Sequence, residues 1–171
     1  KNKIILVEKP LFKEHTKYKI KNKVFVAYNL RFHPIINYLK NKKIIYLNAI
    51  VGQDLRQWRN KNYKQCYSSS KIKGGGVLRD LSHEIDYIQY INGKIKNIKA
   101  TIGKQSTLNI DTEDIVVANG KTKKAIFSFS LDYISDIPFR QIIAYTKNKT
   151  YICDLINNTI NGKKLKNIDK N

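Results

Sequence analysis

The segment Gly74–Gly93, with the sequence GGGVLRDLSHEIDYIQYING, contains the residues that decide how the chain folds. Three glycines lead into apolar residues at helical spacing, and Asn92-Gly93 is a C-terminal stop signal. The segment therefore predicts an amphipathic helix from about Gly76 to Ile91. On a wheel turning about 100° per residue, one apolar stripe faces the core. We expect this stripe to consist of Leu78, Leu81, Ile85 and Ile88.

The face beside this stripe contains three residues with reactive side chains. Asp80, His83 and Tyr87 fall within about 60° of one another, because residues three, four and seven apart stack on a helix. Histidine is the side chain best suited to proton transfer near neutral pH, and a neighbouring carboxylate orients its ring and raises its basicity. The pattern favours His83 as a general base with Asp80 beside it.

Other interpretations of the segment require residues that it lacks. A phosphate-binding loop needs a preceding strand and a G-x-G-x-x-G or G-K-[ST] pattern. A metalloprotease helix needs H-E-x-x-H, and Tyr87 occupies the place of the second histidine. Asp80, His83 and Asp86 do not share one helix face, so we expect no metal site. A surface His–Asp pair without catalytic function remains as the alternative.

The rest of the chain predicts an open, mostly antiparallel sheet with a few helices packed on one face, an α+β class. A short helix is expected from Pro34 to about Leu39, and a long loop over residues 53–73. Asn119-Gly120 and Lys147–Lys149 are predicted hairpin connectors. The expected strands are Ile4–Val7, Val24–Tyr28, Ile44–Val51, Ile95–Ile102, Asp114–Ala118, Lys124–Tyr133, Phe139–Tyr145 and Thr150–Leu155.

The 171-residue chain carries a formal net charge of +20, with 28 lysines and 5 arginines against 13 acidic residues. Such a charge is typical of proteins that bind nucleic acid. The lysines are spread along the whole chain, however, and no cluster of arginines and aromatic residues is present to recognise bases. Nucleic-acid binding is therefore only a minor alternative, which predicts steeply salt-dependent association.

Cysteine usage and hydropathy indicate where the protein resides. Cys66 and Cys153 stand far apart and outside any paired motif, so we expect no disulfide or structural zinc, and a reducing cytoplasm. No run of about 18 apolar residues is present, so no membrane-spanning helix is expected. The N-terminal sequence lacks a signal-peptide pattern. Because the chain contains no methionine, we expect it to begin inside a longer protein.

Two further stretches extend this interpretation. VEKPLF (Val7–Phe12), VAYNLRFHP (Val26–Pro34) and GGGVLRDLSHEIDY (Gly74–Tyr87) occur in this order. Together they resemble the glucose–fructose oxidoreductase/inositol dehydrogenase/MocA (Gfo/Idh/MocA) family of NAD(P)-dependent sugar oxidoreductases. The resemblance implies a Rossmann domain, missing from this chain, of which residues 1–12 are the end and the crossover. Residues 13–171 would form an α+β substrate-binding domain whose open sheet makes a homo-oligomer.

The resemblance also implies an active site. Lys9 would lie beside the nicotinamide and the reacting hydroxyl, with Asp80 and His83 as its catalytic partners. Much of the family spaces the acid and the histidine D-x-x-x-H, whereas the spacing here is D-x-x-H. Glu8, Lys9 and Pro10 would contact the cofactor, NAD or NADP, which the missing domain would bind for the most part.

The expected substrate is a sugar, an amino sugar or a nucleotide sugar. Tyr28, Asn29 and Arg31 are expected near the pocket mouth, with Arg31 either clamping an anionic group or forming a structural salt bridge. Trp58 and Tyr67 are expected either to stack on a sugar ring or to pack in the core, and Tyr87 is expected in the substrate pocket. A non-catalytic oligomerisation module of the same fold is the second hypothesis.

Overall fold

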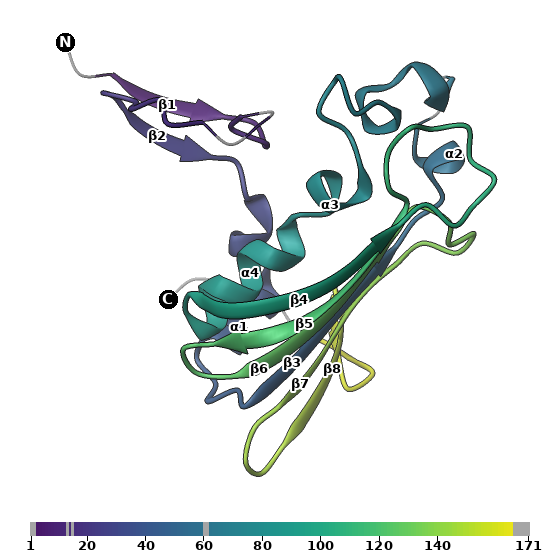
Figure 1. Ribbon diagram of the computed structural model, residues 1–171. Coiled ribbons are helices and arrows are strands. Elements are labelled where there is room, and N and C mark those ends of the chain that lie inside the picture. The colour runs from purple at the N-terminus through teal and green to yellow at the C-terminus, as the bar shows by residue number, and fades with distance from the viewer. Residues whose placement is uncertain (1–2, 13, 15, 60–61, 166–171) are drawn as a thin grey trace.

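The computed structural model describes residues 3–12, 14, 16–59 and 62–165. Its largest element is an eight-stranded sheet in the order β10-β9-β8-β7-β3-β6-β5-β4 (Figure 1). Neighbouring strands are antiparallel except β3 and β6, which are parallel. The strands are β3 (Tyr46–Gly52), β4 (Ile95–Gly103), β5 (Ile115–Thr122), β6 (Ile126–Asp132), β7 (Phe139–Tyr145), β8 (Thr150–Asp154), β9 (Thr159–Ile160) and β10 (Lys163–Lys164).

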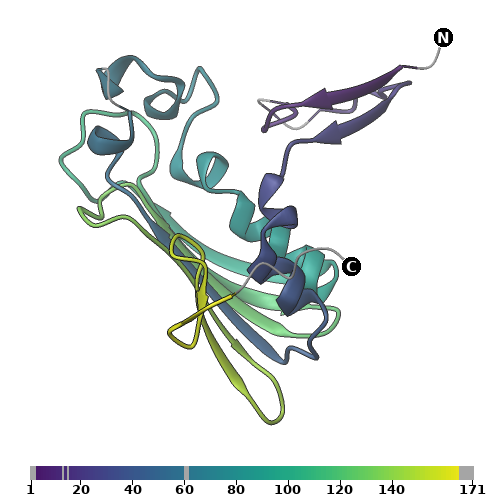
Figure 2. The same ribbon diagram turned by 180° about the vertical axis from the view of Figure 1, so that it is seen from behind.

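The helices α1 (Pro34–Lys40) and α4 (His83–Asn92) lie on the same side of the sheet, as Figure 1 and Figure 2 show. The expected α+β class, with helices on one face of an open sheet, is confirmed. Along β6, Phe127, Phe129 and Leu131 are buried and alternate with more exposed residues, which confirms the predicted period of two. The shorter helical elements are α2 (Leu55–Trp58), α3 (Val77–Asp80), η1 (Asn29–Phe32), η2 (Tyr63–Gln65) and η3 (Tyr67–Ser69).

Two strands stand apart from this sheet. β1 (Ile4–Val7) and β2 (Lys23–Val26) pair in parallel and project away from the helix layer (Figure 1). Their apolar side chains are open to solvent, with Ile4 72% and Leu6 73% exposed. The expected boundary after residue 12 falls within the connection between these paired strands.

The predicted helix over residues 76–91 is two helices, and the prediction of one continuous helix was wrong. α3 ends at Asp80 and α4 begins at His83. The ammonium of Lys9 donates hydrogen bonds to the carbonyl oxygens of Arg79 (3.2 Å) and Asp80. In an uninterrupted helix, the amides of His83 and Glu84, four residues further along, would donate to these two carbonyls. A side chain inserted at this point is a recognised cause of a helix break.

Asn119-Gly120 was wrongly predicted as a hairpin connector, because both residues lie inside β5. A Cβ on Gly120 would come 2.2 Å from the carbonyl oxygen of Asn97 and 2.9 Å from the ring of Phe127. The glycine therefore serves close packing between strands rather than a turn. The connector over residues 147–149 is confirmed between β7 and β8. Residues 53–73 include α2, η2 and η3, and the end of the tail, residues 166–171, lies outside the described residues.

We predict that Gly75→Ala destabilises the chain by about 1–3 kcal/mol, the range typical of forced overpacking. A Cβ at Gly75 would lie 2.0 Å from the carbonyl oxygen of Tyr67 and 2.6 Å from that of Ser68, and backbone atoms cannot easily move aside. Gly103→Ala is the control, since its nearest atom is the flexible end of Gln105 at 3.0 Å. Urea unfolding of both variants measures the difference, and equal stabilities would contradict the packing proposed for the glycine segment.

Candidate active site

Lys9 lies against the C-terminal end of α3, where its two carbonyl contacts place it beside the start of α4. Burial lowers the pKa of Lys9, while the carboxylates of Asp80 and Glu84 act in the opposite direction. An ammonium group has three N–H donors, and the two carbonyls accept from two of them. One donor of Lys9 is therefore left for a further acceptor. Glu8 and Pro10, on either side, are exposed.

His83 is the first residue of α4, and its ring packs edge-on against Tyr28 with the ring centroids 5.6 Å apart. Its Nδ1 atom is buried and has no hydrogen-bond partner among the described residues. Burial, followed by the positive charges of Lys9 and Arg140, lowers the pKa of His83 to about 4. The imidazole is therefore neutral at pH 7. A neutral imidazole with an unpartnered nitrogen is equipped to accept a proton.

Asp80 is buried, and its carboxylate has partners other than His83. The hydroxyl of Tyr133 donates to Oδ2 over 2.6 Å, and Nη2 of Arg59 lies 3.5 Å from the same oxygen. No hydrogen bond joins Asp80 to His83 within the described part of the chain. Asp80, Lys9 and His83 are thus close in the fold, since Lys9 contacts the backbone of Asp80, but the expected Asp80–His83 hydrogen bond is not formed.

Arg59 is a site residue that the sequence interpretation missed. Its guanidinium lies over the ring of Trp58, 4.3 Å from the centroid, and over Tyr67 at 5.1 Å. It also donates to the hydroxyls of Tyr67 (3.2 Å) and Ser68 (3.1 Å). Burial and the nearby Asp80 raise the pKa of Tyr67 to about 12. Each aromatic ring therefore has one face covered by Arg59, and the Trp-Arg pair in a long loop was the only signal in the sequence.

A second ion pair lies beneath the site. Glu84, the residue after His83, is fully buried and accepts from Nε of Arg140 on β7 over 3.0 Å. Burial raises the pKa of Glu84, and the positive charge of Arg140 opposes that shift. Arg140 also acts on His83, so the pair contributes to the charge environment of the imidazole. No local pattern indicates this pair, because 56 residues separate its members.

The side chain of Tyr87, a residue of α4, is fully buried, and its hydroxyl lies 3.5 Å from the carboxylate of Glu84. Tyr87 was expected in the substrate pocket, but its side chain is fully buried and does not line the pocket described below. Leu78 and Ile85, expected in the buried stripe, are only half-buried. Arg31 forms the structural salt bridge that was the alternative, donating to Asp86 over 2.6 and 2.8 Å.

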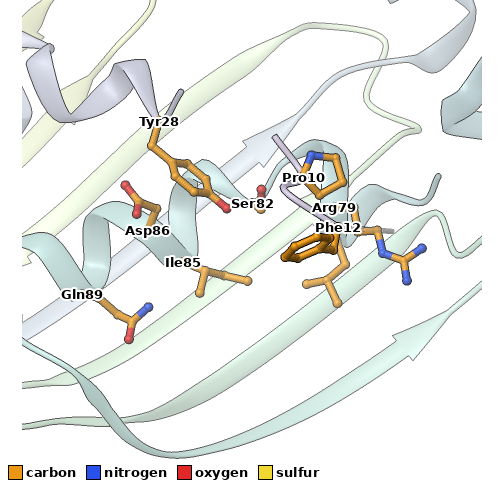
Figure 3. A pocket seen from close by; sticks show the side chains of 9 residues that line it. Pro10, Phe12, Tyr28, Arg79, Ser82, Ile85, Asp86 and Gln89 are labelled. Atoms are coloured by element: carbon orange, nitrogen blue, oxygen red, sulfur yellow. The ribbon is translucent and has the colours of Figure 1, made fainter. Parts of the chain in front are cut away.

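A pocket of about 440 Å³ lies beside the start of α4 (Figure 3). Tyr28, whose ring contacts His83, forms part of its wall, and Asn29 follows as an exposed residue at the start of η1. The volume of the pocket falls within the range of small-molecule sites, about 300–1,000 Å³. The pocket lies between the segment that follows β1 and the polar side of α4. It is lined by Pro10, Phe12, Tyr28, Leu78, Arg79, Ser82, Ile85, Asp86 and Gln89.

Within residues 3–165, apart from the gaps in the described chain, no group of three or more histidine, cysteine, aspartate or glutamate side chains is placed to hold a metal ion. Among the same residues, no helix has the length and apolar character needed to cross a membrane.

We predict that His83 titrates with a pKa of about 4, below the usual value of 6.5, because its charged form is desolvated beside Lys9 and Arg140. NMR titration of the ring protons measures this value, and loss of the signal in His83→Asn assigns it. This pKa makes the stability depend on pH. As the pH falls below 6.5, the unfolded chain binds a proton that the folded chain does not, so the free energy of unfolding decreases. A pKa at or above 6.5 would contradict the described environment.

We predict that Arg140→Met destabilises the chain by about 3 kcal/mol, because it leaves the buried carboxylate of Glu84 without its counter-charge. Arg56→Met is the matched control. Arg56 pairs with Asp54, whose buried carboxylate also accepts the backbone N–H of residue 56, and the Arg56 side chain is 61% exposed, so a smaller change is expected. Chemical unfolding at pH 7 compares the two variants, and an equal loss in both would contradict the importance of the Glu84–Arg140 pair.

Solved structures show what this chain is similar to in three dimensions. An NAD binding oxidoreductase from Klebsiella pneumoniae matches with a TM-score of 0.71 at 17% identity, over 91% of this chain and 48% of that chain. Levoglucosan dehydrogenase in complex with NADH and levoglucosan gives a TM-score of 0.64 at 17% identity, over 80% and 42%. UDP-N-acetylglucosamine 3-dehydrogenase from Acidithiobacillus ferrooxidans gives 0.62 at 18% identity, over 79% and 40%.

These similarities concern the fold alone, because the identities are low. No family model matches the chain, and a search of curated proteins found no significant similarity. The chain spans only 40% to 48% of the lengths of the three structures. The chain shares the fold of part of these three oxidoreductase structures, which agrees with the fold expected from its resemblance to Gfo/Idh/MocA-type sugar oxidoreductases.

Proposed function

We propose that the chain is the substrate-binding part of an NAD(P)-dependent oxidoreductase that acts on a sugar hydroxyl. The observation that carries the proposal is the pair formed by Lys9 and His83. A neutral imidazole with a buried, unpartnered Nδ1 stands beside an ammonium group that has one donor to spare. A base and a positively charged hydrogen-bond donor are the two groups that alcohol oxidation requires of a protein.

In the oxidation direction, a ring nitrogen of His83 accepts the hydroxyl proton while the C–O bond becomes a carbonyl. Nicotinamide, when bound, supplies the redox chemistry by accepting the hydride from the same carbon. Lys9 donates its remaining hydrogen bond to the oxygen as negative charge develops on it. The imidazolium then loses its proton readily to solvent, because its positive charge lies close to Lys9 and Arg140. In the reduction direction, His83 donates the proton instead.

The N-terminal segment is suited to contact a domain that binds the nicotinamide cofactor, either NAD or NADP. Parallel strands are normally covered on both faces, whereas β1 and β2 expose apolar side chains such as Ile4 and Leu6. The strand pair therefore fits the edge of a larger parallel sheet, which moves the proposed domain division from residue 12 to the end of β2. Glu8 and Pro10 flank Lys9 at the surface that would face the cofactor.

The substrate proposed for this site is a sugar, an amino sugar or a nucleotide sugar. Tyr28 is placed at the wall of the pocket next to His83, and Asn29 is exposed beside it. Tyr67 keeps 39% of its surface exposed, so the face not covered by Arg59 suits the apolar face of a sugar ring. Trp58 packs near Tyr133 at 6.3 Å and contributes mainly to holding this loop.

The open face of the sheet supports a homo-oligomer. Exposed apolar residues alternate with buried ones on β5, β6 and β8, as Val117 (51% exposed), Ile126 (56%) and Ile152 (56%) do. A non-catalytic oligomerisation module is the second candidate function, and this face is the observation that favours it. The free cysteines Cys66 and Cys153 are compatible with a reducing cytoplasm.

We predict that His83→Ala, in the complete enzyme with its dinucleotide-binding half, lowers turnover by about 10²–10⁴-fold, the usual contribution of a general base. Affinity for the cofactor should change little, because His83 acts on the sugar hydroxyl. Stopped-flow reduction of NAD(P) and cofactor titration measure the two effects. The control is His33→Asn, which preserves an acceptor for the amide of Ile35 at the start of α1. Unchanged turnover in His83→Ala would contradict the assignment of His83 as the general base.

A further inference from the structure

The carboxylate of Asp80 is the centre of a buried polar cluster that holds a loop. Tyr133, just after β6, donates to it over 2.6 Å, and Arg59, just after α2, lies 3.5 Å away. Because Asp80 is 2% exposed, both partners act on a carboxylate that water hardly reaches. Hydrogen bonds to a buried charged group are stronger than those between neutral groups. Asp80 therefore ties the helix layer to two distant parts of the chain.

Arg59 extends this cluster into the loop that follows it. Its guanidinium lies between the rings of Trp58 and Tyr67 and donates to the hydroxyls of Tyr67 and Ser68. We call residues 58–59 and 62–69 the wall segment. Among the described residues of the wall segment, Arg59 is the only cation that lies against the carboxylate of Asp80. The Asp80–Arg59 contact therefore links the rings of Trp58 and Tyr67 to the helix layer.

His83 belongs to a different set of contacts. The charged groups that act on its imidazole are Lys9 and Arg140, which lower its pKa, and Asp86, which raises it. The ring of Tyr28 covers its edge. Asp80 does not belong to this set, and it forms no hydrogen bond with His83 in the described part of the chain. The two residues that the sequence paired therefore face different partners on either side of the break between α3 and α4.

We infer that Asp80 is a positioning residue for the wall segment, acting through Arg59 and Tyr133, and not the group that orients His83. The inference rests on the proposed function only in assigning the wall segment to the substrate side. It separates the two halves of the site: Lys9 and His83 handle the proton, while Asp80, Arg59 and Tyr133 fix the aromatic surface against which the sugar ring lies. In the complete enzyme, Asp80→Asn should raise KM for the sugar more than it lowers kcat.

The test uses the 171-residue chain without cofactor or substrate, so its outcome does not depend on the proposed function. Trp58 is the only tryptophan, and its emission reports on the wall segment directly. Amide hydrogen exchange of residues 62–69 reports on the same segment, and the ring ¹⁵N chemical shifts of His83 at pH 7 report on the imidazole. For Asp80→Asn we expect a changed Trp58 emission, amide exchange faster by about tenfold, and unchanged His83 shifts.

Asp86→Asn is the matched control, because Asp86 acts on the imidazole and pairs with Arg31, outside the wall segment: the His83 shifts should move while the Trp58 emission stays the same. Tyr133→Phe removes a single hydroxyl and tests the inference even if Asp80→Asn fails to fold. It should accelerate exchange in residues 62–69 and leave His83 unchanged. A shift of the His83 nitrogens in Asp80→Asn or Tyr133→Phe overturns the inference, as does a wall segment unaffected by both.

Discussion

The hydrogen bonds from the ammonium of Lys9 to the carbonyl oxygens that end α3 hold the site together. They join residues 70 and 71 positions apart and connect the segment after β1 to the helix layer. The same contacts separate α3 from α4, which gives Asp80 and His83 different surroundings. Burying an ammonium is unfavourable unless acceptors and counter-charges compensate it. Here the carbonyls supply the acceptors, and the carboxylates of Asp80 and Glu84 supply the charge.

This arrangement explains why the imidazole of His83 is neutral at pH 7. A carboxylate beside a histidine normally raises its pKa, but burial and the positive charges of Lys9 and Arg140 lower the pKa of His83. In the proposed reaction, a proton that His83 accepts would therefore be released readily to solvent. Glu84 and Arg140 lie below, fully or largely shielded from water, and hold the first turn of α4 against β7. This pair thereby anchors the helix turn that carries His83.

Local patterns predicted much of this fold, and distant contacts account for what they missed. The alternation around Phe127 and Phe129 defined a strand without further information. The first and third motifs meet in the fold, where Lys9 bonds the carbonyl oxygens of Arg79 and Asp80. The helix break was hidden, because the side chain inserted there, Lys9, lies outside the helical pattern. The burial of Tyr87 was missed, because the helical wheel placed its side chain on the polar face. The carboxylate partners of Arg59 and Arg140 had no local signal, since each arginine acts on a carboxylate supplied by another part of the chain. Asn119-Gly120 looked like a turn because its use for close strand packing is not visible in sequence.

The central claim is that this site removes a proton while hydride leaves the same sugar carbon for nicotinamide. The most direct measurement offers the complete protein sugars deuterated at the carbinol carbons, together with NAD or NADP, and follows the label by NMR of the recovered cofactor. The account predicts deuterium at C4 of the nicotinamide ring and a slower reaction for the deuterated sugar. Absence of label with every sugar and both cofactors, in a folded protein that binds the cofactor, would contradict it.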